Sequence, residues 1–519
     1  MKRRGTMGST FHGLEVAKRG MAVQQMALYT TSHNIANANT LGYSRQRVNF
    51  VQSEPYPPAS LNRPQIPGQM GTGVEAGSIE RVRDRFFDWQ YRGENNKLGY
   101  WQAQADALKK MEDIMNEPSD SGLSKTMDQF WQALQDLSAN PENTGARSVV
   151  RQRGLAVVET FHYLADSLTS IQNDLANEIQ VTVKSINSIA EQLYKINQQI
   201  AEVEPHGYLP NDLYDERDRL LDELSALVKI EVEPKPSGGN ALKTAEGSYD
   251  VYIFDGNGQR QLLVNGNQGY QTLSVSPSAS SSPEMPTGPL TGLSLGGSSI
   301  PFVASGKLKG LIEAYGYDDG SGVKGIYPDM LKKLDTLAYS FAKRFNEVHQ
   351  TGYTLSPSNL GGLFFSDLTQ VDGAAKAIQL SSNIDDLNNI AASSAPNEPG
   401  NGLNAIRLAN VKNSNFANLQ DPAPSVSYPI TAGTLQAYYE SMIGQLAVDT
   451  QQANRLVNNS EVLRQSVEER RQSVSGVSLD EEMTNMIRFQ HAYNAAARTI
   501  TTIDEMLDKI INGMGIVGR

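Results

Sequence analysis

Cysteine is absent from this chain of 519 residues, and aromatic residues make up only 7% of it. The absence of cysteine excludes disulfide bridges, thiolate zinc sites, iron–sulfur clusters and a cysteine nucleophile. The sequence has no run of about 18 apolar residues, which a membrane-spanning helix would need. The opening MKRRGT is followed by polar and charged residues rather than by the apolar run of a secretory signal, and Met7 is an alternative start. We therefore expect no general secretion signal and no membrane partner.

Acidic residues outnumber basic ones, since 57 Asp and Glu against 45 Lys and Arg leave a formal charge of −12. Phosphate backbones are bound by clustered positive charge, so this balance argues against a nucleic-acid partner. Hydrophobic residues make up 39% of the chain, which supports a folded core. Because a typical domain has about 150 residues, the length predicts roughly three or four units.

The motifs of cofactor and catalytic sites are missing or incomplete. Residues 71–77 have their third glycine one place too late for a dinucleotide loop, and Arg260 stands where a calcium loop starting at Asp255 needs glycine. The sequence contains no GxSxG, HExxH or P-loop lysine motif, and its six His are scattered. We therefore expect no catalytic residue, no metal site, no cofactor and no enzymatic activity. A glycan-acting enzyme or adhesin and a helical sensor module are the alternatives from other classes.

Apolar residues recur every seven positions at both ends of the chain. Such a stripe is narrow, and one helix cannot bury it alone. The two stripes therefore predict contact either with each other or with the same helices of other subunits, although a single stripe is also compatible with an ordinary core helix. Ser478 and Glu481 form a capping box that starts the last helix. The expected subunit contacts are Leu14, Met21, Leu28, Ile35, Leu479, Met486, Phe489, Tyr493, Ile500, Ile503, Leu507 and Ile510.

The interior of the chain alternates between helix-forming segments and a segment of short strand-like runs. Long helices are expected after the start signal Asn140-Pro141 and again beyond Leu435. Short apolar runs separated by Asp-Gly and Asn-Gly predict β-hairpins in 231–303, and ten Asp or Glu in 202–233 are interpreted as a solvated face. The expected fold is mainly α with a β-rich insert. Its parts are a coiled-coil-like inner domain of terminal helices (7–50 and 478–519), a long-helix bundle (51–230, 304–353 and 431–477), an outer β domain (231–303) and a mixed irregular segment (354–430).

An Asn-rich segment follows the first stripe and ends in Gly42-Tyr43. We expect the first helix to stop before Asn34, and the Asn side chains to set the angle at which it leaves the outer domain. With Tyr43-Ser44-Arg45-Gln46 directly after it, this segment resembles the signature of the bacterial flagellar axial proteins (rod, hook and hook-associated proteins). Leu41 departs from the family pattern, which usually has Pro there. The motif residues are Asn34, Ile35, Ala36, Asn37, Asn39, Thr40, Gly42, Tyr43, Ser44, Arg45 and Gln46.

Later segments favour the hook-associated branch at the hook–filament junction. They are Asn211-Asp212-Leu213, the helix around Leu334-Asp335, and Gly476-Val477-Ser478-Leu479. Another axial subunit, such as a distal rod or hook protein, is the main alternative within the family.

The resemblance implies a structural subunit that forms a ring between hook and filament. It also implies export through the flagellar type III apparatus without a cleaved signal, and a location outside the cell. The implied partners are copies of itself, the hook protein, a second junction protein and a flagellar export chaperone at the C-terminal helix, with no nucleic acid and no membrane. Because Gln, Asn, Thr and Ala fill much of the terminal stripes, we expect both ends to be disordered before assembly and to fold on docking.

Overall fold

The structure is a computed structural model of the chain. It describes residues 10–57, 59, 61, 68–115, 119, 122–277, 288–356, 359–420 and 422–513. The opening MKRRGT and the alternative start Met7 lie outside the described residues.

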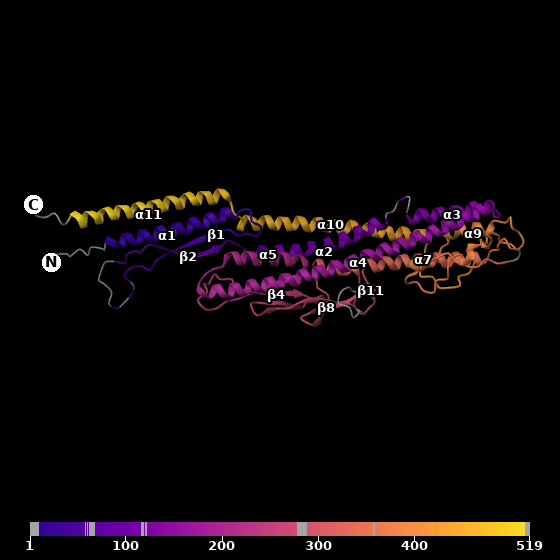
Figure 1. Ribbon diagram of the computed structural model, residues 1–519, viewed down its shortest axis with the longest axis horizontal. Coiled ribbons are helices and arrows are strands. Elements are labelled where there is room, and N and C mark those ends of the chain that lie inside the picture. Colours follow the sequence, from indigo (N-terminus) through magenta and orange to yellow (C-terminus); the bar gives the residue numbers. More distant parts are fainter. Residues whose placement is uncertain are drawn as a thin grey trace, which may run out of the picture.

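The molecule is elongated, and both ends of the described chain lie at the same end of it (Figure 1). There α1 (Thr10–Ala36) and α11 (Leu479–Gly513) run side by side and form the helix pair. An antiparallel hairpin of β1 (Gln46–Gln52) and β2 (Val74–Arg81) lies against α1. The chain then passes through a body of long helices and returns to the same end. The predicted class, mainly α with several β-strands, is confirmed.

One helix of 60 residues, α4 (Thr144–Val203), runs along the body. At about 1.5 Å per residue it is about 90 Å long. Asn143 caps it, because its side-chain oxygen accepts hydrogen bonds from two backbone N–H groups of the first turn. The start predicted at Asn140 is therefore wrong, since Asn140 ends the preceding helix instead. The other helices of the body are α2 (Arg85–Met115), α3 (Leu123–Ala139), α5 (Asn211–Leu227), α6 (Lys307–Tyr315), α7 (Ile326–Gln350) and α10 (Leu435–Ser475).

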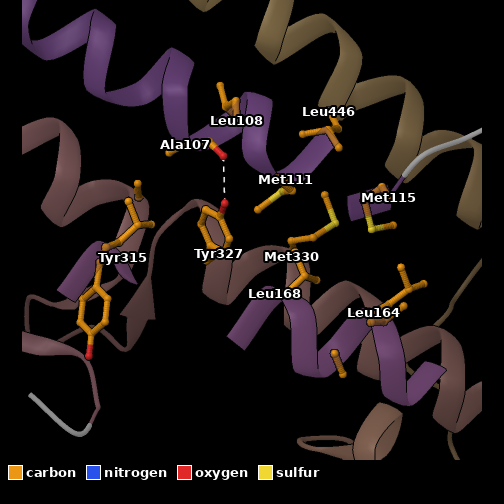
Figure 2. Close-up of a cluster of buried hydrophobic side chains, with 14 of the residues drawn as sticks. Ala107, Leu108, Met111, Met115, Leu164, Leu168, Tyr315, Tyr327, Met330 and Leu446 are labelled. Carbon is orange, nitrogen blue, oxygen red and sulfur yellow. Dashed lines mark hydrogen bonds between the residues drawn. The ribbon is translucent and has the colours of Figure 1, made fainter. Parts of the chain in front are cut away.

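One part of the hydrophobic core lies where α2, α4, α7 and α10 meet (Figure 2). Met111 of α2 and Leu168 of α4 are fully buried there, and Met330 of α7 is 5% exposed. The unbranched Met side chains fill irregular gaps between the helices. Tyr327 is also buried, and its hydroxyl donates a hydrogen bond of 2.9 Å to the carbonyl of Ala107. The regular apolar spacing of the interior thus builds a bundle core, as the sequence predicts.

Two β-sheets lie along one side of α4 (Figure 1). Asn197 of α4 anchors the first sheet by donating a hydrogen bond of 3.0 Å to the carbonyl of Tyr249. The hairpin predicted at Asp255-Gly256 is confirmed, and Asp255 Oδ1 accepts a hydrogen bond from the N–H of Asn257 at 3.0 Å. The strands of the first sheet are β3 (Ile230–Lys235), β4 (Ser248–Phe254), β5 (Arg260–Asn265) and β6 (Gly269–Tyr270). Those of the second are β7 (Leu273–Pro277), β8 (Leu290–Leu295), β9 (Ser298–Ile300), β10 (Tyr317–Asp318) and β11 (Val323–Lys324).

The irregular segment 354–430 lies at the end of the molecule away from the chain termini (Figure 1). Its short helices include α8 (Ala374–Ala377) and α9 (Leu403–Ala409). His349 of α7, which is fully buried, holds two of its loops. The ring donates from Nδ1 to the carbonyl of Gly362 at 2.8 Å and accepts at Nε2 from the N–H of Ala391 at 2.9 Å. Burial lowers the pKa of His349 to about 4, so the ring is neutral at physiological pH.

Candidate functional site

The two helices of the helix pair pack along each other within one chain (Figure 1). Ala17, Val23 and Ala27 of α1 are buried. At Gly13 the fit is close, since an added Cβ would lie 3.2 Å from Cδ1 of Ile503 in α11. Of the two arrangements that the sequence left open, the structure thus contains the contact between the two ends. Pairing removes part of each apolar stripe from water. The expectation that both ends are disordered before assembly and fold on docking stays a prediction.

The predicted seam residues are only partly covered by this pairing. Leu479 and Ile510 remain 48% and 44% exposed. A contact between two helices covers one side of each seam and leaves the other side open. The remaining seam residues are half-buried: Leu14, Met21, Leu28, Ile35, Met486, Phe489, Tyr493, Ile500, Ile503 and Leu507.

Further exposed apolar side chains flank the seam. On α11, Met483, Ile487 and Ile511 are 56%, 54% and 73% exposed. On α1, Phe11 and Tyr29 are 62% and 66% exposed. Met483 and Ile487 are four positions apart and therefore neighbours on one face of α11, and adjoining exposed apolar side chains are typical of interaction sites. Tyr29, Met483, Ile487 and Ile511 fall outside the seven-residue spacing, so that spacing does not indicate them.

Asn34 connects the helix pair to the start of β1. Its side chain is 1% exposed. Its amide donates to the carbonyl of Gln46 at 2.8 Å and to Glu482 Oε2 at 3.1 Å. Its oxygen accepts from the N–H of Gln46 at 3.0 Å and from the Tyr43 hydroxyl at 2.8 Å. One side chain thus ties together α1, β1 and the first turn of α11; we call Asn34, Arg45, Gln46 and Glu482 the joint.

The end of α1 differs from the prediction. The helix continues through Ala36, so Asn34 and Ile35 belong to its last turn, and the expectation that the helix stops before Asn34 is wrong. Asn favours turns because its side chain competes for backbone hydrogen bonds. Here the Asn34 side chain bonds to groups outside its own helix, which leaves the helical backbone intact.

The turn itself begins at Asn37. Asn37 Nδ2 donates to the carbonyl of His33 at 3.1 Å, and Asn37 Oδ1 accepts from the Thr40 hydroxyl at 3.1 Å. Gly42 has a φ of +82°, a left-handed conformation that favours glycine. Asn39 is exposed. The part of the motif that shapes the turn is therefore Asn37 to Gly42, whereas Asn34 acts as a buried connector.

Arg45 connects the residues before β1 to the first turn of α11. Its Nε donates to Glu482 at 2.8 Å, and its Nη1 donates to Glu481 at 2.7 Å. Glu482 is 2% exposed, so its pairing with Arg45 compensates a buried charge. The hydroxyl of Ser478 accepts from the N–H of Glu481 at 3.5 Å, which is one half of the predicted capping box. The carboxylate of Glu481, which the capping box assigns to a backbone N–H, bonds to Arg45 instead.

Two carboxylates of the acidic run in α5 are buried. Asp215 and Asp218 are 7% and 4% exposed, so their interpretation as a solvated face is wrong. Arg81, at the end of β2, donates to Asp215 at 2.7 Å and to Asp218 at 2.9 Å. The backbone N–H of Ser44 also donates to Asp215, at 3.0 Å. Pairing with arginine is what permits these carboxylates to be buried.

The same network extends to three further elements. Arg92 of α2 donates to Asp222 at 2.8 Å, and Arg471 of α10 bonds to the same carboxylate. Glu246, just before β4, accepts from the fully buried Arg217 at 2.6 Å. The ion pairs therefore join β2, α2, α5, α10 and the first sheet near the joint.

The pKa values of two buried carboxyl groups in this network shift in opposite directions. Burial raises the pKa of Asp218, but Arg83, Arg81 and Arg92 outweigh burial and hold the pKa of that carboxyl well below its usual range. At Asp215 burial is stronger than the arginine and raises its pKa. Asp218 is therefore the ionised centre of the network over the physiological pH range.

The described residues contain no group of three His, Asp or Glu placed to hold a metal ion. Among the described helices, none is long and apolar enough to cross a membrane. The titratable groups around the joint instead pair with one another and fix how the helix pair meets the body. This arrangement can hold a fixed angle between the helix pair and the body, with exposed apolar side chains beside it.

Three family models match parts of the chain. The helical domain of the flagellar hook-associated protein FlgK matches residues 108–365. The C-terminal part of the flagellar basal body rod FlgEFG proteins matches 470–513, and the flagella basal body rod protein model matches 14–43. The two terminal matches thus contain α11 and most of α1.

Relatives align along nearly the whole chain. Flagellar hook-associated protein 1 of Bacillus subtilis (strain 168) is 45% identical over 99% of this chain and 100% of its own. The protein of the same name from Salmonella typhimurium is 26% identical over 96% of this chain and 98% of its own. The solved flagellar hook junction protein FlgK from Burkholderia pseudomallei, 14% identical, has a similar fold with a TM-score of 0.56 over 74% of this chain and 100% of its own. Because the first of these identities extends over the full length, the chain belongs to the flagellar hook-associated protein 1 (FlgK) family.

Proposed function

We propose that this protein is a structural subunit at the hook–filament junction, where copies of it form a ring that connects the hook to the filament. Full-length relatedness to hook-associated protein 1 supports this role. The structural observation that carries it is the helix pair, whose seam is half covered and whose flanks expose large apolar side chains. Apolar surface left in water by one copy is stabilised when neighbouring copies cover it.

The partners follow from this position. Copies of the same chain meet through the helix pair, the hook protein lies on one side of the ring and a second junction protein on the other. The helix pair forms the inner domain and the sheets along α4 lie outward. The subunit acts as a non-enzymatic part outside the cell and needs no cofactor.

Export precedes assembly in this proposal. The chain leaves through the flagellar type III apparatus without a cleaved signal, and a flagellar export chaperone binds α11 before export. Met483 and Ile487, each more than half exposed, are apolar residues that such a chaperone would cover. The absence of cysteine suits a chain that moves from a reducing to an oxidising compartment.

A charge in the half-covered seam tests the role of the helix pair. We expect Ile500→Asp to leave cells with hooks but without filaments, because burying an unpaired carboxylate at a contact is costly. The matched control is Thr502→Asp, since Thr502 of the same helix is exposed. Electron microscopy of the cell surface and an assay for released flagellin are the measurements. Normal filaments on the Ile500→Asp strain would contradict the proposal.

Deletion of the whole gene separates the junction role from that of another axial subunit. Loss of a junction protein should leave complete hooks and monomeric flagellin in the medium. Loss of a rod or hook protein should remove the hooks as well. Absence of hooks in the deletion strain would therefore favour the alternative.

A further inference from the structure

A groove of about 400 Å3 lies between α1, β1 and α11, beside the joint. Arg47 and Arg488 line it and are exposed, and Phe50, another lining residue, is 44% exposed. The ring of Phe50 meets the ring of Phe489 edge-on, with 6.0 Å between their centroids. The groove therefore combines an aromatic surface with arginine, a composition typical of the centres of protein interfaces.

The charge of this groove is not balanced. Within the residues that the structure describes, neither Arg47 nor Arg488 forms an ion pair. The guanidinium of Arg488 lies 5.1 Å from the centre of the Phe489 ring, and Glu80, opposite Arg47 in the strand register, accepts a hydrogen bond from Ser78. The groove thus presents two guanidinium groups to a partner.

A surface of opposite charge lies at the far end of the same helix. Asp504, Glu505 and Asp508 are exposed there, beside Ile511, which is 73% exposed. Lys509 is the one basic residue between positions 499 and 512. Among the described residues, no ion pair engages these three carboxylates. This acidic end of α11 has the charge and the apolar side chain that would complement the groove.

The two surfaces cannot meet within one chain. Arg488 and Asp508 are 20 positions apart, which at about 1.5 Å and 100° per residue means about 30 Å along α11 and about 200° around it. For Asp504 the values are about 24 Å and 160°. Arg488 and the two Asp residues therefore lie on nearly opposite sides of α11. A contact between them requires two copies.

We propose that the acidic end of α11 in one copy docks into the groove of the next copy, so that neighbouring subunits are joined head to tail. This inference rests on the proposed assembly of the subunit and names its contact. Each copy contributes its acidic end to one neighbour and its groove to the other neighbour, which is the geometry of a heterologous interface. Parallel copies joined in this way are displaced by about 24–30 Å along the helix axis. Because each copy is displaced along the axis relative to its neighbour, the ring proposed above is wound helically rather than flat.

Cysteine crosslinking tests the contact directly, since the natural chain contains no cysteine. A chain with Arg488→Cys and Asp508→Cys would replace the native copy in cells, and the assembled flagella would be oxidised and separated without reductant. We expect disulfide-linked dimers and larger multimers that collapse to monomers on reduction. The control pairs Arg488→Cys with Asp174→Cys, because Asp174 is exposed on α4, and should remain monomeric. Filament-bearing cells without multimers would overturn the docking inference and leave the proposed function standing.

Charge exchange provides the second measurement. Arg47→Glu with Arg488→Glu, and separately Asp504→Lys with Asp508→Lys, should each cause loss of most filaments. The chain that carries all four substitutions should regain them, because the contact is then re-formed with the charges exchanged. Unchanged filament counts in both two-residue variants, or no recovery in the combined variant, would overturn the inference. Neither result bears on Ile500→Asp, whose effect reports on the proposed function itself.

Discussion

Replacing Asp218 with Ala should destabilise the body by about 3–5 kcal/mol, the usual cost of removing one partner of a buried ion pair. Asp218 is 4% exposed, and it lies 2.9 Å from Arg81, 3.1 Å from Arg92 and 3.5 Å from Arg83. Without the carboxylate, three buried guanidinium groups share the remaining acids. The cost arises from the charges left behind more than from the bonds lost.

An exposed pair on the same helix provides the control. Glu216 and Arg219 pair with side chains that are 44% and 38% exposed, so Glu216→Ala should cost less than about 1 kcal/mol. Urea unfolding followed by circular dichroism measures both variants, and a shift in midpoint at constant slope reports the change in free energy. Equal losses in the two variants would refute the argument that burial makes the network strong.

The pH dependence adds an independent check. The pKa of Asp218 in the folded chain lies below its ordinary value, so its ion pairs stabilise the fold above about pH 4 and lose this effect as the pH falls further. Asp218→Ala should remove this part of the acid sensitivity. A variant that keeps the full wild-type loss between pH 4 and pH 2 would contradict the assignment of Asp218 as the ionised centre.

Three further outcomes are expected. The free energy of unfolding should fall by about 3 kcal/mol as the pH drops from 6.5 to about 4, because His349 takes up a proton at a higher pH in the unfolded chain than in the folded one. His349→Gln should flatten this pH dependence, measured by urea titrations. Asn34→Ala should cost about 1–3 kcal/mol for each buried group left without a partner, measurable as a lower unfolding midpoint. In hydrogen exchange on the isolated chain, amides of 10–36 and 479–512 should exchange faster than those of 144–203, because the helix pair buries far less apolar surface than the body; equal protection would contradict this ranking.

The features that the sequence predicted are those that a helix or a turn encodes locally. The heptad spacing of the terminal stripes depends on one helix at a time, so the helix pair and its seam could be expected from residues such as Leu14 and Ile500. The hairpin at Asp255-Gly256 is equally local, because the turn type itself demands these residues. The choice between pairing within a chain and pairing between chains is not encoded in the spacing.

The features that the sequence analysis missed depend on distant residues. Asp218 lies in an acidic run whose composition fits a solvated face, and its partner Arg81 stands 137 positions away. Asn34 has the chemistry of a turn residue, yet its partner Glu482 is 448 positions away, and that contact keeps it inside a helix. Asn140 and Asn143 have the same capping chemistry, but Asn140 ends α3, with its N–H bonded to the carbonyl of Leu137, and Asn143 starts α4. Tertiary pairing settles each of these, and a single sequence does not reveal it.

Because the body is elongated, a small change of angle at the joint becomes a large displacement at the opposite tip. If the body extends about 90 Å from the joint, as the length of α4 indicates, a tilt of about 5° at Asn34 and Arg45 moves the opposite tip by about 8 Å. That displacement exceeds the reach of a hydrogen bond, so the stiffness of a few buried side chains near the base decides whether the tips of adjacent subunits remain aligned under load.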